Sequence, residues 1–174
     1  APTFNTDSDG ALTIEYKPAG ADDSAYTAAA PKKVGKYIIR ITTAETDTCK
    51  AASSTMAFEI KPREVTISGV TVSEKVHDGN ANAKITAAGV IDGLVDGDKV
   101  SIVTGKALYD DKNVGTGKTV TFYDFALSGE DAANYVLSAQ PASTTASISA
   151  RELTIKNLAV KDKQYDGKNS AEID

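Results

Sequence analysis

A sequence repeat constrains this chain more than any other feature. The residues Arg-Glu-Val-Thr-Ile that begin at Arg63 recur as Arg-Glu-Leu-Thr-Ile from Arg151, 88 residues further on. Each copy continues to a Lys-x-x-Asp-Gly segment, Lys75–Gly79 in the first and Lys163–Gly167 in the second. Repetition at a fixed period indicates one structural unit used more than once. We therefore expect a first domain at residues 1–61, a second at 62–150, and at 151–174 the first strand of a third unit, truncated at Asp174.

Both copies interrupt their apolar alternation at the same place. Val65 and Ile67 alternate with polar residues, and Val70 and Val72 resume the alternation one position out of phase. A one-residue slip turns the following side chains to the opposite face of a strand. The pattern predicts a β-bulge near Ser68-Gly69, at which one strand leaves its sheet and joins another. The second copy repeats the pattern with Leu153, Ile155, Leu158 and Val160, so a second bulge is expected near Lys156-Asn157.

Short alternating segments separated by turn residues predict strands throughout the chain, and no segment has the apolar period of a helix. Regular spacing of strands and turns is typical of all-β sandwiches and barrels. We expect an all-β fold of tandem immunoglobulin-like β-sandwich repeats, with small β-grasp-like sheet domains as the alternative. The expected strands are residues 11–17, 36–44, 51–60, 64–75, 82–86, 98–105, 118–127, 134–139 and 144–150.

The predicted joints between units are short. The segments Lys61–Glu64 and Ser149–Glu152 follow an isoleucine in each case and contain no glycine. Chains without glycine and of this length have little freedom to bend. We therefore expect neighbouring domains to be stiffly coupled.

Two tyrosines follow turns in the manner of a tyrosine corner, in which the hydroxyl of a tyrosine at the sandwich end bonds back to the main chain. Tyr135 comes after the acidic turn Ser128–Asn134 and enters a strand. Tyr37 follows Val34-Gly35-Lys36 and enters the alternating residues of the next strand. We expect the two rings to occupy equivalent places in the first two domains.

These residues also carry a family resemblance. Residues 62–174, with Lys163-Gln164-Tyr165-Asp166-Gly167, Gly97-Asp98-Lys99-Val100 and Lys112-Asn113-Val114-Gly115, resemble the Tyr-Asp-Gly (YDG) repeats of bacteria. Residues 1–61 resemble the related MBG domains through Ala30-Pro31 and Gly35-Lys36-Tyr37. The resemblance implies an extracellular role in adhesion or in a stalk. One departure is that His77 stands where the other copy has Tyr165.

Candidate catalytic and phosphate-binding motifs are incomplete. His77 is the single histidine and so the only candidate base for a nucleophilic triad, but its counterpart Tyr165 favours a structural role. Gly115–Thr119 resembles the end of a phosphate-binding loop, but Lys112 occupies the position of the loop's first glycine. We interpret Gly115–Thr119 as a hairpin turn and expect no enzyme activity.

Calcium is the best metal candidate. Asn5–Gly10 places oxygen ligands at alternate positions with a glycine at the turn, as a calcium loop does, but Tyr16 replaces the carboxylate at the twelfth position. We therefore expect a plain turn, no metal and no cofactor. The lone Cys49 is expected to be a small, half-buried residue rather than a reactive thiol or an intermolecular bridge. No lysine, asparagine and acid can be assigned to an isopeptide crosslink by spacing.

Charge and hydropathy exclude several partners. A net charge of −5 without a basic cluster excludes a nucleic-acid interface. No apolar run approaches the roughly 20 residues of a membrane span, and no leader opens the chain, so we expect any signal or anchor outside this sequence. We expect a monomeric, extracellular spacer of a bacterial adhesin whose partners are neighbouring repeats of the same chain. The alternative is a module that binds a host protein or glycan, or one accessory to a surface enzyme.

Overall fold

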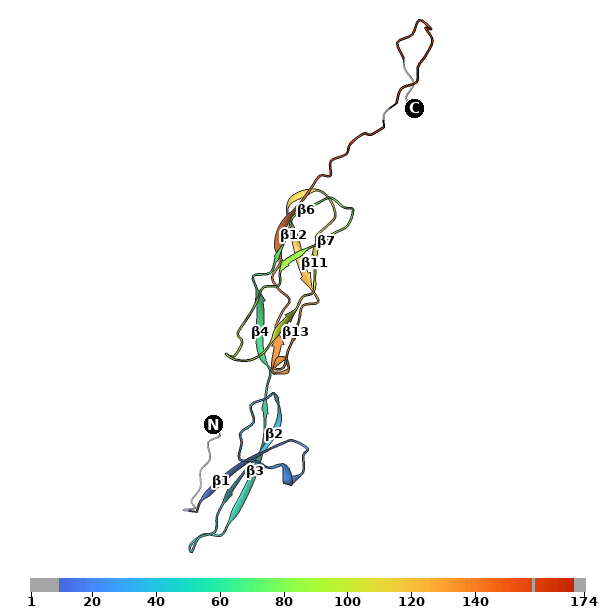
Figure 1. The fold of residues 1–174 in the computed structure, drawn as a ribbon. Helices are drawn as coiled ribbons and strands as arrows, with labels where there is room; N and C mark the ends of the chain where they lie inside the picture. The colour runs from blue at the N-terminus through green and yellow to red at the C-terminus, as the bar shows by residue number, and fades with distance from the viewer. Residues whose placement is uncertain (1–9, 158, 171–174) are drawn as a thin grey trace.

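The computed structural model describes residues 10–157 and 159–170 of the chain (Figure 1). These residues form β-strands and two short 3-10 helices, η1 (Asp23–Ala25) and η2 (Ala132–Asn134), without an α-helix among them. No helix in this part of the chain is long and apolar enough to cross a membrane. The predicted all-β class is confirmed, and the strands form several small sheets. The finer assignment to immunoglobulin-like repeats stays a prediction.

An antiparallel sheet occupies the N-terminal part of the molecule and is called the N-terminal sheet below. It consists of β1 (Leu12–Pro18), β2 (Gly35–Thr43) and β3 (Ala52–Ile60) in that order. Cross-strand partners place Tyr16, Ile39 and Met56 on one face. On the same face the Phe58 ring contacts Tyr16 edge-on and stacks against Tyr37. Ile39 is 5% exposed, but Met56 is 69% exposed, so this apolar face is only partly covered.

The opposite face of the N-terminal sheet is polar. Arg40 donates two hydrogen bonds to the Glu15 carboxylate on β1, and its guanidinium lies 3.7 Å from the centroid of the Tyr26 ring. The ammonium of Lys17 contacts Asp23 at 2.7 Å. Because planar guanidinium groups stack on aromatic rings, this cluster holds the loop from η1 to Tyr26 against the sheet.

Residues 63–149 form a second body, called the second unit below. Its largest sheet has the strand order β6-β15-β12-β11-β7, a smaller one has the order β14-β4-β9, and two-stranded sheets pair β10 with β13 and β5 with β8. The strands are β4 (Arg63–Ser68), β5 (Thr71–Val72), β6 (Lys75–Val76), β7 (Asn82–Ala83), β8 (Ile85–Ala87), β9 (Val90–Asp92), β10 (Ser101–Val103), β11 (Lys106–Tyr109), β12 (Gly115–Tyr123), β13 (Ala126–Ser128), β14 (Tyr135–Leu137) and β15 (Thr144–Ser149).

One hydrophobic core holds the second unit together. The alternating residues Val120 and Phe122 of β12 are 0% and 1% exposed, and Ile148 of the adjacent strand β15 is 1% exposed. The Phe122 ring meets Phe125 edge-on. The period-two alternation of β12 thus buries one face against the other sheets, as expected for a half-buried strand. The cluster comprises Ile67, Ala107, Tyr109, Val120, Phe122, Phe125, Ala146 and Ile148.

The predicted sheet switch is confirmed for the first copy of the repeat. β4 pairs with β14 and β9, whereas β5, three residues later, pairs with β8 in a different sheet. Gly69, between the two strands, has φ of 71°. Asn157, at the corresponding place of the second copy, has φ of 58°. Because left-handed backbone favours glycine and asparagine, the slip in the apolar pattern and the residue type indicate the same turn.

Other strand predictions were wrong in detail. The expected continuous strand 118–127 is two strands, because Asp124 has φ of 61° and ends β12. Phe125 then turns inward, and the Gln140 side chain bonds both its N–H and its carbonyl, at 2.7 and 3.0 Å. A side-chain amide here replaces a strand partner. The short strands β9 and β11 were not expected at all.

The parts of the chain lie end to end in Figure 1. Lys61 and Pro62 alone separate β3 from β4. Strands of the N-terminal sheet pair only with one another among the described residues. Beyond the second unit, residues 151–157 form no strand, and Leu153 and Ile155 are each 89% exposed. The division into two domains and a third first strand stays a prediction.

Candidate functional site

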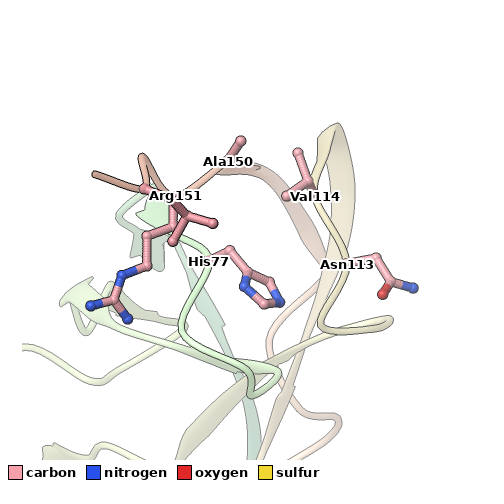
Figure 2. Close-up of a pocket in the computed structure, with 6 residues that line it drawn as sticks. His77, Asn113, Val114, Ala150 and Arg151 are labelled. Atoms are coloured by element: carbon pink, nitrogen blue, oxygen red, sulfur yellow. The ribbon is translucent and has the colours of Figure 1, made fainter. Parts of the chain in front are cut away.

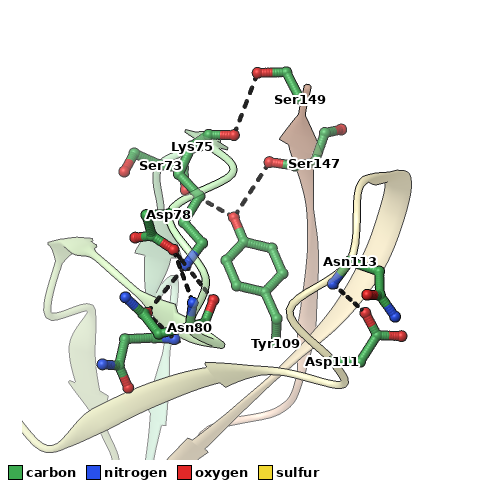
Figure 3. Close-up of polar contacts among 10 residues, drawn as sticks. Ser73, Lys75, Asp78, Asn80, Tyr109, Asp111, Asn113, Ser147 and Ser149 are labelled. Atoms are coloured by element: carbon green, nitrogen blue, oxygen red, sulfur yellow. Dashed lines mark hydrogen bonds and ion pairs between the residues drawn. The ribbon is translucent and has the colours of Figure 1, made fainter. Parts of the chain in front are cut away.

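The repeated Lys-x-x-Asp-Gly segment forms a closed polar turn at one end of the second unit (Figure 3). The Lys75 ammonium contacts the Asp78 carboxylate at 2.8 Å and the Asn80 carbonyl at 2.7 Å. Asp78 also accepts the Asn80 N–H. The hydrogen bond from Lys75, followed by that from the Asn80 N–H, lowers the pKa of Asp78. Gly79 closes the turn with φ of 84°, a conformation that explains why glycine stands there.

The second copy forms the same turn. Lys163 contacts Asp166 at 3.0 Å and the Lys168 carbonyl at 2.7 Å, and Asp166 accepts the Lys168 N–H. Gly167 has φ of 72°. Since Tyr165 is 97% exposed, this turn does not depend on a packed core. The lysine, aspartate and glycine of the repeat are therefore explained by local turn chemistry.

In the second unit the turn is also fixed to the strands beneath it. The Lys75 ammonium lies 5.5 Å from the centroid of the buried Tyr109 ring. The Tyr109 hydroxyl donates to the Ser73 carbonyl at 3.1 Å, and the His77 N–H donates to the Ser149 carbonyl at 2.9 Å. These contacts place the turn beside the last strand of the unit.

His77 lies in a shallow pocket at this end of the second unit. The other lining residues are Asn113, Val114, Ala150, Arg151 and Leu153 (Figure 2). The pocket has neither a serine nor a cysteine nor a carboxylate in its lining. It therefore supplies neither a nucleophile nor an acid to work with the imidazole.

The interpretation of Gly115–Thr119 as a hairpin turn was wrong. These residues belong to β12, and the turn that precedes them is residues 110–114. The strand register shifts between Gly115 and Lys118 opposite β15, with Gly117 at φ of 61°, so the glycines form a β-bulge. Lys118 is held by Asp110 at 2.9 Å and Asp111 at 2.7 Å. These hydrogen bonds raise the pKa of Lys118 and lower those of both carboxyl groups.

The remaining candidates are the calcium loop and Cys49. Residues 5–9 of the calcium candidate Asn5–Gly10 lie outside the described residues. Within the described part of the chain, no group of three or more histidine, cysteine, aspartate or glutamate residues could hold a metal ion. Cys49 is half-buried in the turn between β2 and β3, where its N–H donates to the Thr46 hydroxyl at 3.0 Å.

The two tyrosine corners differ in their partners. The Tyr37 hydroxyl donates to the Lys33 carbonyl at 2.9 Å, which is the predicted bond to the main chain just upstream. The Tyr135 hydroxyl accepts the Val95 N–H at 3.0 Å and donates to the Asp98 carboxylate at 2.5 Å. The hydrogen bond to Asp98, followed by burial, raises the pKa of Tyr135. Tyr135 thus fixes the loop between β9 and β10 at the end of the second unit nearest the N-terminal sheet.

A direct contact joins that end to the N-terminal sheet. The Val34 N–H, in the loop before β2, donates to the Asn134 side-chain oxygen at 3.0 Å. The next residue, Tyr135, pairs with Arg63, the first residue after the spacer. Asn134 therefore lies directly before β14, which pairs with β4, the first strand after the spacer. Val34, Lys61, Arg63, Asp98 and Asn134 line a shared pocket there.

Sequence reasoning identified the short spacer but not the Asn134 contact. The two residues are 100 positions apart, and their sequences carry no pairing signal. The one signal that could have drawn attention to the loop of Val34 is the segment Lys-x-Val-Gly, which occurs at Lys32–Gly35 and again at Lys112–Gly115. The Lys75–Asn80 turn and the Val34–Asn134 contact thus lie at opposite ends of the second unit.

Comparison with known families identifies part of the chain. Residues 61–146 match the YDG domain family, so the chain contains a YDG domain over most of the second unit. No curated protein matches the chain, and neither does a solved structure.

Proposed function

We propose that this chain is a spacer segment of an extracellular bacterial adhesin, in which a YDG domain and an MBG-type domain follow one another as stiff repeats and display a distal adhesive part. The joint between β3 and β4 is the observation that carries the proposal. Only Lys61 and Pro62 lie between these strands, and the Val34–Asn134 hydrogen bond spans the joint at 3.0 Å.

The physical reason is that a spacer must resist bending. A flexible linker lets neighbouring domains average over many directions, whereas a joint with few free dihedrals and a cross-contact selects one. Proline removes a further degree of freedom, because its ring fixes φ near −65°. The end-to-end arrangement of the sheets in Figure 1 suits extension rather than enclosure of a substrate.

Small-angle X-ray scattering on the chain tests this proposal. We expect a maximum dimension and a cross-section typical of a single rod. A matched variant with Gly-Ser-Gly-Ser inserted between Lys61 and Pro62 keeps every domain residue and should show a shorter average dimension with a broader distance distribution. Indistinguishable curves from the two proteins would contradict a stiff joint.

A second candidate function, binding of a host protein, is favoured by the apolar face of the N-terminal sheet. Leu12 is 43% and Met56 is 69% exposed on that face. Exposed apolar patches often mark protein-binding sites. Arrays of matrix proteins and glycans test this function, with Met56→Lys as the comparison. Binding of a matrix protein that Met56→Lys abolishes would favour it, and equal binding by both proteins would oppose a role for this face.

A further inference from the structure

The N-terminal sheet and the second unit are built alike at the end where the chain leaves each of them. In the N-terminal sheet, Gly35 opens β2 and pairs with Ile60, the last residue of β3. In the second unit, Gly115 opens β12 and pairs with Ile148, near the end of β15. The residue before the glycine is a valine in both cases, Val34 and Val114. The loops that end at Val34 and Val114 thus lie at equivalent positions beside the last strand of each unit.

The sequence that follows each strand is also equivalent. Arg63-Glu64 comes three residues after Ile60, and Arg151-Glu152 comes three residues after Ile148. Because both the register and the spacer length agree, a domain that starts at Arg151 would meet Val114 as the second unit meets Val34. The main-chain donor of Val34 is bonded to Asn134, whereas that of Val114 has no acceptor among the described residues.

The surface around Val114 is open. Val114 is 53% exposed and Leu153 is 89% exposed, and both line the pocket of Figure 2 with His77 and Arg151. At the first joint the corresponding space is lined by residues of both neighbours, including Val34 and Asn134. The pocket of Figure 2 therefore corresponds to the surface that the N-terminal sheet contributes at the first joint, without the surface of a following unit.

We propose that this pocket is the seat of the Asn-Tyr turn of a second copy of the YDG unit, joined through Arg151-Glu152, and that the Val114 N–H donates to the asparagine oxygen of that copy. The inference rests on the proposed function, because it takes the next repeat as the partner. It goes further in naming the donor, the acceptor and the surface. The acceptor is the counterpart of Asn134, which Tyr135 and Arg63 fix at the first joint.

The test uses an extended chain in which a copy of residues 65–149 follows Glu152. Amide hydrogen exchange of Val114 is measured by NMR in the original and extended chains. A hydrogen bond that contributes about 1 kcal/mol slows exchange about fivefold, so we expect slowing of at least that size in the extended chain. The amide of Val34 serves as the internal reference, because its bond to Asn134 is present in both.

Variants of the copy assign the acceptor. Asn134→Ala in the copy should restore the fast exchange of Val114 and leave Val34 unchanged. Asn134→Asp in the copy keeps an acceptor oxygen and should keep the protection. Slow exchange of the copy's Val120 amide verifies that each variant is folded.

Two results would overturn the proposal: unchanged exchange of Val114 in the extended chain, and protection that survives Asn134→Ala in the copy. Scattering from the same extended chain separates this failure from failure of the spacer function. A rod with an unprotected Val114 refutes the assigned contact alone, whereas flexibly linked units refute the stiff spacer as well.

Discussion

Removal of one hydroxyl group, in Tyr135→Phe, should destabilise the second unit strongly. The ring is 7% exposed, and its hydroxyl joins two loop positions, the Val95 N–H at 3.0 Å and the Asp98 carboxylate at 2.5 Å. A hydrogen bond to a charged group contributes about 1.5–3 kcal/mol, and one to a neutral group about 0.5–1.5 kcal/mol. Val95 is 46% exposed, so water can replace part of its bond.

The expected loss is therefore about 2–3 kcal/mol of the free energy of unfolding. With a urea dependence of about 1 kcal/mol per molar for a unit of this size, the unfolding midpoint should fall by about 2–3 M. The midpoint is followed by NMR signals of Val120 and Phe122, which report the second unit because both are buried in its core.

Two matched variants control for the loss of a tyrosine hydroxyl. Tyr123 is 45% exposed, and Tyr123→Phe should change stability by less than about 0.5 kcal/mol. Tyr37→Phe removes one bond to the Lys33 carbonyl in the N-terminal sheet and should leave the Val120 signals unaffected. A midpoint for Tyr135→Phe within 0.5 M (roughly 0.5 kcal/mol) of the unaltered chain would refute the assignment of Tyr135 as the fixing residue of this end.

Three further predictions concern packing, pH and the joint. Gly105→Ala should destabilise the second unit by about 2 kcal/mol or more, measured by urea unfolding, because the added carbon would overlap the Tyr123 carbonyl oxygen; unchanged stability would contradict this close approach. Lys118 lowers the pKa of Asp110 and Asp111. The stabilisation from these two ion pairs is therefore complete above the ordinary carboxyl pKa of about 3.9, and it is lost as the pH falls further, through the lowered pKa of each carboxyl group. Lys118→Met should flatten that acid-side loss in pH-dependent unfolding, and an equally steep loss would oppose this cause. Asn134→Ala should speed amide exchange of Val34 by about fivefold, because it removes a hydrogen bond that contributes about 1 kcal/mol. Unchanged exchange would contradict the Val34–Asn134 contact.

The sheet switch could be predicted because its cause is local. The out-of-phase apolar residues on either side of Ser68-Gly69 must face different sheets, and the glycine permits the turn between them. The same reasoning applied to Lys156-Asn157, and Asn157 has left-handed backbone there. The place of the spacer after Ile60 was also predictable, but the predicted segment Lys61–Glu64 was too long, because Arg63 and Glu64 already belong to β4.

Contacts between distant segments could not be predicted from the sequence. The break at Asp124 depends on Gln140, whose side-chain amide substitutes for a strand partner of Phe125. The Tyr135 hydroxyl bonds to Asp98, 37 positions away, although the turn before Tyr135 indicated only a main-chain partner. The Val34–Asn134 contact arises from the two-residue spacer, and no periodic pattern encodes it.

Residual dipolar couplings measured separately for the N-terminal sheet and the second unit test the stiff joint most directly. We expect amides of β2 and amides of β12 to report one common alignment tensor, because Lys61-Pro62 and the Val34–Asn134 bond fix one relative orientation. Two tensors of different magnitude, unchanged when Gly-Ser-Gly-Ser is inserted after Lys61, would contradict a stiff joint.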